Sequence, residues 1–88
     1  MVEISTGILE RYAADAAREI DGVRSVSKVK IANENGAARV ELRIAVAWGA
    51  SIPALGRDVQ VRVREYLLRM ADMERATVDV IVDEIGPE

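Results

Sequence analysis

The chain has 88 residues, half of them hydrophobic, which is enough for one domain with a core of its own. It contains neither cysteine nor histidine, which excludes disulfides, thiolate metal sites and the usual general base. A net charge of -3, with one tryptophan and two tyrosines as the only aromatic residues, argues against nucleic acid as the main partner.

The N-terminal residues carry no targeting signal. Met1 to Ile4 include neither a basic segment nor an apolar run, so no signal peptide is expected. No apolar stretch approaches the roughly 20 residues that span a bilayer. We therefore expect a cytoplasmic protein without direct membrane insertion. The alternation of Val2 and Ile4 about Glu3 leaves open a short fourth strand or an extended lead-in.

Residues 7–20 repeat apolar side chains at helical spacing and predict an amphipathic helix. Ser5 and Thr6 are both candidate N-caps, because a hydroxyl there can accept a hydrogen bond from a free amide of the first turn. Gly22 is expected to end the helix in the left-handed conformation.

Two strands joined by a hairpin follow. Residues 24–31 predict a strand with Val29 and Ile31 inward and Lys28 and Lys30 outward, and Asn35-Gly36 predicts the turn. Residues 39–48 alternate more regularly than any other segment. Their predicted inward set is Val40, Leu42, Ile44, Val46 and Trp48, and their outward set is Arg39, Glu41, Arg43, Ala45 and Ala47.

A long helix and a last strand complete the chain. Ser51 is expected to cap a helix whose first turn holds Pro53. Seven residues of this helix form a core stripe about 120° wide on a helical projection. They are Ile52, Leu55, Val59, Val63, Tyr66, Leu67 and Met70. The last strand, 76–85, places Val78, Val80 and Val82 on one face.

This order predicts an α+β fold, α-β-β-α-β, as a single domain over residues 1–88. We expect both helices on one face of a small three-stranded sheet and the opposite face open. That open face mixes basic and acidic side chains, which is typical of a solvated, self-neutralising surface.

No motif in the chain supports catalysis. A serine nucleophile would need a base other than histidine, and Ser51 is better explained as a helix cap. Asp79, Asp83 and Glu84 could attract a hard cation, but their spacing matches no known calcium loop. No phosphate-binding glycine pattern is present. We therefore expect no enzyme, no cofactor and no metal.

The long helix carries a second apolar line opposite its core stripe. Ala54, Val61 and Leu68 are spaced seven apart, and we call these three residues the heptad seam. Four charged residues flank it: Arg57 and Arg64 on one side, Asp58 and Glu65 on the other. Such a pattern is typical of a narrow helix-packing surface. It predicts self-association or docking of a partner helix, with chance alignment on a solvated face as the alternative.

Four stretches, taken together, resemble the alkaline shock protein twenty-three family, the Gls-type envelope stress response proteins of bacteria. They are residues 2–5 leading to a helix that closes on residues 19–23, the strand 40–46 before Trp48-Gly49, the helix opening Ile52-Pro53 with Val59-Gln60, and the valine-alternating strand 76–82. Longer members carry a Gly-rich insertion after the Gly-Val step. This chain lacks the insertion, and Arg24 leads almost directly into the strand.

The resemblance implies a non-enzymatic cytoplasmic protein of envelope homeostasis that self-associates and reaches the membrane through a small membrane-anchored partner. The residues themselves offer two candidate surfaces, the heptad seam with Arg57 and Arg64, and the outer sheet face with Arg39, Glu41 and Arg43. The alternative is a small-ligand or nucleic-acid-binding module that uses the open sheet or the Trp48–Ser51 turn.

Overall fold

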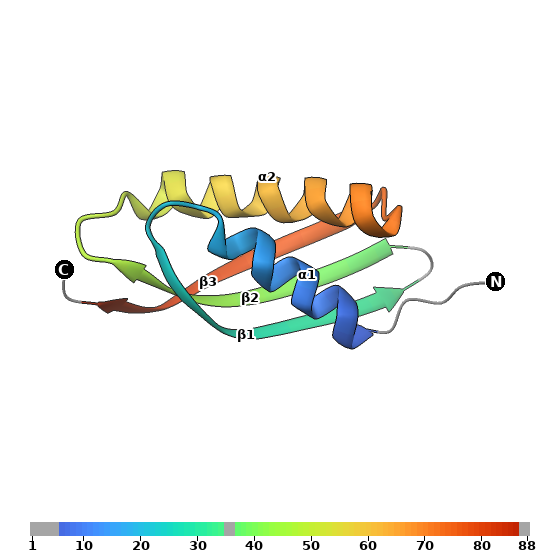
Figure 1. The fold of residues 1–88 in the computed structure, drawn as a ribbon, viewed down its shortest axis with the longest axis horizontal. Coiled ribbons are helices and arrows are strands. Elements are labelled where there is room, and N and C mark those ends of the chain that lie inside the picture. Colours follow the sequence, from blue (N-terminus) through green and yellow to red (C-terminus); the bar gives the residue numbers. More distant parts are fainter. Residues whose placement is uncertain (1–5, 35–36, 87–88) are drawn as a thin grey trace.

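The computed structural model describes residues 6–34 and 37–86 and confirms the predicted order α-β-β-α-β (Figure 1). The elements are α1 (Thr6–Arg18), β1 (Val23–Glu34), β2 (Ala37–Ala47), α2 (Ile52–Ala71) and β3 (Ala76–Gly86). Residues 1–5, where a fourth strand and the Ser5 cap were considered, lie outside the described residues, as do the hairpin residues 35 and 36.

The three strands form one sheet in the order β1-β2-β3. β2 pairs antiparallel with β1, with Val29 opposite Leu42, and parallel with β3, with Leu42 opposite Val80. As the central strand, β2 has a fully buried inner row: the side chains of Val40, Leu42 and Ile44 are 0% exposed. The alternation predicted for this strand is therefore confirmed as far as Val46.

Both helices cover the same face of the sheet, as predicted (Figure 1). α1 packs on β1, α2 packs on β3, and the two helices pack against each other, with the rings of Tyr12 and Tyr66 meeting edge to face at 5.9 Å. α1 can lie close to the sheet because its buried face includes the small side chains of Ala13, Ala16 and Ala17. The core is one cluster between these two layers.

α2 buries the middle of its predicted stripe but not the ends. Leu55, Val59, Val63 and Leu67 are buried, whereas Ile52 and Met70 remain exposed. Ser51 occupies the N-cap position without a side-chain hydrogen bond, so the predicted hydroxyl cap is wrong.

Two predictions near the turns are also wrong. β2 ends at Ala47, so Trp48 leaves the inward row and is 65% exposed. α1 ends at Arg18 rather than Ile20, and a turn separates it from Gly22. Gly22 does have the predicted positive φ, at 100°, because the chain reverses there into β1.

Candidate interaction surfaces

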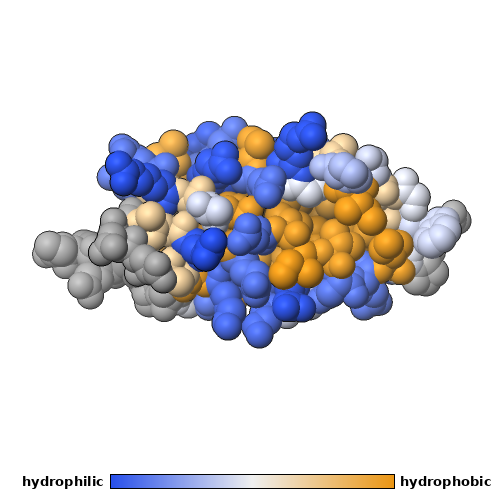
Figure 2. Space-filling model, turned by 180° about the vertical axis from the view of Figure 1, so that it is seen from behind, coloured by the Kyte–Doolittle hydropathy of each residue, from blue (hydrophilic) through white to orange (hydrophobic). Residues whose placement is uncertain are grey.

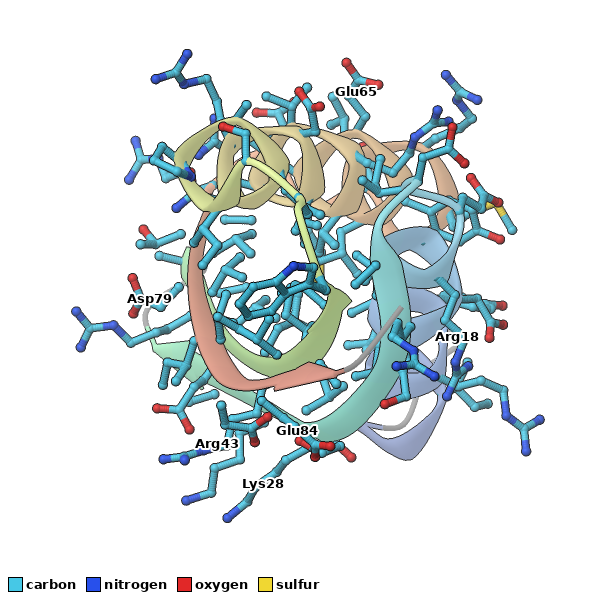
Figure 3. The ribbon with its side chains drawn as sticks, turned by 90° about the vertical axis from the view of Figure 1, so that its left-hand side faces the viewer. Arg18, Lys28, Arg43, Glu65, Asp79 and Glu84 are labelled. Carbon is cyan, nitrogen blue, oxygen red and sulfur yellow. The ribbon has the colours of Figure 1, made fainter. Side chains whose placement is uncertain are left out.

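The outer sheet face carries the predicted charged residues on the side away from both helices (Figure 3). Arg39 Nε lies 4.0 Å from Asp79, and Arg43 Nε lies 4.0 Å from Glu41. These distances are too long for hydrogen bonds, and solvent-exposed pairs of this kind contribute at most about 1 kcal/mol. The Arg43 Nε atom is buried and has no hydrogen-bond acceptor among the described residues.

The outer face is not open along its whole length, contrary to the prediction. Where β2 approaches Trp48, Ala45 is only 9% exposed. Bulges in β1 and β3 curl the two edge strands toward each other there, so that the Ser27 hydroxyl donates to Asp83 at 2.9 Å across β2. Arg24 lies against Gly86 at the same end. The open part of this face is therefore its middle and its Arg39 end.

The heptad seam is exposed along the back of α2, where the sequence placed it. Val61 is 45% and Leu68 47% exposed, and Ala54 is exposed as well. Arg57 and Arg64 lie on the β3 side, where Arg64 Nε donates to the Ala76 carbonyl at 3.3 Å.

The other flank of the seam faces α1. It carries Asp58 and Glu65, and Figure 3 shows Glu65 pointing outward from the top of the molecule. Beside this flank, Arg62 of α2 forms an ion pair at 3.4 Å with Glu19, the residue that follows α1. The seam is thus a narrow apolar line between a basic and an acidic border.

The structure does not bring the two predicted surfaces together. The outer sheet face and the seam point in opposite directions, with the core between them (Figure 3). A partner that contacts one of them leaves the other free.

A third surface was missed by the sequence analysis. Between α2 and β3 lies an open groove of about 300 Å³, here called the β3 groove. It is lined by Ile52, Pro53, Gly56, Arg57, Gln60, Val80 and Val82. Seen from behind, apolar surface gathers below α2 toward the end where β3 finishes (Figure 2). The sequence contained one sign of this groove. Gly56 lies inside the long helix, four residues from both Ile52 and Gln60, and its missing side chain leaves space on that side of the helix.

β3 is an edge strand, and α2 covers only the first part of that edge. Gln60 Nε2 donates to the Val78 carbonyl at 2.9 Å, and Arg64 covers Ala76. The described α2 side chains that bond to this edge, Gln60 and Arg64, reach Val78 and Ala76 but not Val80 or Val82. The groove lies beside this uncovered part.

The described part of the chain shows neither a cluster of metal-binding side chains nor a membrane-spanning helix. No group of three histidine, cysteine, aspartate or glutamate side chains is placed to hold a metal ion in residues 6–34 and 37–86. Neither helix in that part of the chain is long and apolar enough to cross a membrane.

Among solved structures, the chain is similar to variants of the MamM CTD. A single-residue variant has a TM-score of 0.67 at 19% identity, over 91% of this chain and 95% of that chain. A double variant has a TM-score of 0.66 at the same identity and coverage. A copper form has a TM-score of 0.62 at 13% identity, over 96% of this chain and 99% of that chain. At these identities the likeness shows the fold alone.

Comparison with curated proteins gave no match. The family model of the alkaline shock protein twenty-three family, described as having a cell envelope-related function, matches residues 25–87. That match runs from β1 through β3 and so includes both strand pairings and the whole of α2. This chain belongs to the alkaline shock protein twenty-three family, the family that the four sequence stretches resemble.

Proposed function

We propose that this protein is a non-enzymatic scaffold of the cell envelope that associates with copies of itself through the heptad seam. The observation that carries the proposal is the exposure of Val61 and Leu68 on a long helix, at 45% and 47%. Scattered exposed apolar residues need no explanation, but residues in heptad register between charged borders are the pattern of helix pairing.

The charged borders favour one orientation of the two helices. In a symmetric antiparallel pair each border would face its own copy, so Arg57 and Arg64 would meet their like. In a symmetric parallel pair the basic border of one helix faces the acidic border of the other, which carries Asp58 and Glu65. We therefore assign a parallel α2–α2 contact between two copies.

Sedimentation velocity across a wide concentration range tests this contact. The Leu68→Glu and Val61→Glu variants place a charge in the seam and should shift the protein toward monomer. Met70→Glu is the matched control, because Met70 lies on the same helix with the same 45% exposure as Val61 but off the seam. Its self-association should equal that of the wild type. A wild type that stays monomeric, or seam variants that sediment like Met70→Glu, would refute the proposal.

The envelope connection is supported by the family description. We place the scaffold at the cytoplasmic side of the membrane, held there by a small membrane-anchored protein, as the resemblance implies. Recovery of tagged protein with membranes checks this part. In a second experiment, inverted vesicles are first treated with protease to digest the membrane proteins exposed on their outer side, and the tagged protein is then added. The proposal requires that the treated vesicles no longer recover the protein, since lipid alone should not retain an acidic protein.

A further inference from the structure

We infer that the β3 groove binds an extended segment of another protein, which adds to the sheet beside β3 and alternates apolar with basic residues. This surface shares only Arg57 with the border of the heptad seam and contains none of the seam residues themselves, so the inference does not depend on self-association. It concerns a different partner and a different mode of contact, the addition of a strand to a sheet edge.

The backbone of β3 presents free hydrogen-bonding groups at the groove. Successive residues of a strand direct their N–H and C=O groups to opposite sides. The Arg75 carbonyl accepts from Ala38 of β2, whereas those of Ala76 and Val78 accept from α2 side chains. By this alternation, the groups of Val80 and Val82 also point away from β2. They form an uncovered edge of the kind that pairs with an incoming strand.

The dimensions of the two layers leave room for one more strand. Three strands spaced about 4.8 Å apart are roughly 14 Å wide, whereas two packed helices of about 10 Å diameter are roughly 20 Å wide. α2 therefore overhangs the edge of β3, as the reach of Gln60 to Val78 shows. A lone strand fits beneath this overhang. A second folded copy approaching edge to edge would bring helices of its own into the same space.

The exposure of the inward-facing valines of β3 also indicates that a neighbouring strand is missing beside Val80 and Val82. Val78 is 2% exposed, but Val80 and Val82, which lie in the same inward row, are only half-buried. Ile52 and Ile85 continue the apolar surface at 38% and 48% exposure. An apolar side chain on the incoming strand would complete the coverage of Val80 and Val82.

One acidic side chain beside the edge favours a basic residue on the other face of that strand. Asp79 is exposed, and Figure 3 shows it pointing outward on the free side of β3. Asp83 is instead bonded to Ser27 across β2, and Glu84 lies beside Arg24. Pairing of β3 with β3 of a second copy would bring the two Asp79 carboxylates onto the same face of one pair of strands, which is unfavourable. A lysine or arginine on the incoming strand would face Asp79 favourably.

Fluorescence anisotropy with a labelled hexapeptide, Lys-Val-Lys-Val-Lys-Val, provides the direct test. The alternating peptide should bind at least fivefold more tightly than Lys-Lys-Lys-Val-Val-Val, which has the same charge and composition but the wrong alternation. In ¹⁵N spectra, the amides of Val80 and Val82 and the Gln60 side chain should show the largest shifts.

Two pairs of variants locate the site. A Cβ at Gly56 meets nothing within 4 Å, so both Gly56→Ala and Gly56→Lys are compatible with the fold. Gly56→Lys should block the groove and abolish binding, while Gly56→Ala retains it. Asp79→Lys should weaken binding at least fivefold, whereas Glu74→Lys, the same charge change at an exposed site outside β3, should weaken it less than twofold.

Several outcomes would overturn the inference. The first two are that the protein does not bind the alternating peptide at millimolar concentration, or that it binds both peptides equally well. The other two are that the Gly56→Lys variant binds the peptide as the wild type does, or that the largest amide shifts fall on the outer sheet face instead of the β3 edge. Concentration-dependent shifts of Val80 and Val82 without peptide, removed by Gly56→Lys, would assign the groove to a second copy. Loss of self-association in the Leu68→Glu variant with peptide binding unchanged would separate this groove from the seam.

Discussion

α2 carries two apolar stripes with opposite fates. The inner stripe, which includes Val63 and Leu67, is 0% exposed at both residues and fills the space above the sheet. The heptad seam, which includes Val61 and Leu68, is nearly half exposed on the other side of the same helix. Hydrophobicity therefore does not decide which residues form the core. The width of the stripe does, because a stripe at i+3 and i+4 covers a broad face and one at i+7 covers a line.

The largest expected difference is between neighbouring leucines on the two stripes. Leu67→Ala should lower the free energy of unfolding by about 2–5 kcal/mol, because it leaves a cavity in the core. Leu68→Ala should change it by less than about 0.5 kcal/mol at a protein concentration low enough to keep the protein monomeric. Urea denaturation followed by circular dichroism measures both. If both variants lost the same free energy of unfolding, Leu68 would have to be buried in the isolated protein, contrary to its 47% exposure.

A smaller effect is expected where the inner stripe meets the turn before β1. Gly22 has φ 100°, and a Cβ there would lie 2.5 Å from Leu55 Cδ1. Gly49 has φ 89° but open space around it. Gly22→Ala should cost about 1–3 kcal/mol and Gly49→Ala about 1 kcal/mol, since only the first adds steric displacement to backbone strain. The comparison fails if thermal unfolding ranks the two variants in the reverse order.

The smallest effect is expected at the start of α2, just before the two stripes begin. Ser51→Ala should lower stability by less than about 0.5 kcal/mol, because the Ser51 hydroxyl makes no capping hydrogen bond. A side-chain cap would contribute about 1 kcal/mol. Denaturant titration against the wild type distinguishes the two values, and a loss near 1 kcal/mol would restore the cap that the sequence predicted.

Most of the fold could be predicted because the patterns are redundant. Four alternating residues in β2 and the four buried residues of the α2 stripe each specify one inward face, and a shift of the strand by one residue would move its whole set to the outer face. The wrong predictions concern the ends of elements, where a single residue determines whether the helix or strand continues. Trp48 continued the alternation, yet β2 ends at Ala47, and a single hydrophobic side chain could not show that the chain turns there.

The candidate surfaces were predictable only in part. The seam depends on spacing within one helix, so the sequence contains it. The β3 groove depends on α2 overhanging an edge strand, and sequence order does not reveal which strand lies at the edge. The curl of the edge strands that covers Ala45 arises from bulges in β1 and β3. A bulge is a shift in the register between two paired strands, so it cannot be predicted from the sequence of one strand alone.

The exposure of Trp48 has a practical consequence for spectroscopy. It is the only tryptophan in the chain, and the residue is 65% exposed in the folded state. Its emission should resemble that of indole in water whether the protein is folded or unfolded, so intrinsic fluorescence should report global unfolding poorly. The same indole should shift its emission to the blue when anything binds over the corner between β2 and α2, which makes it a reporter for that corner.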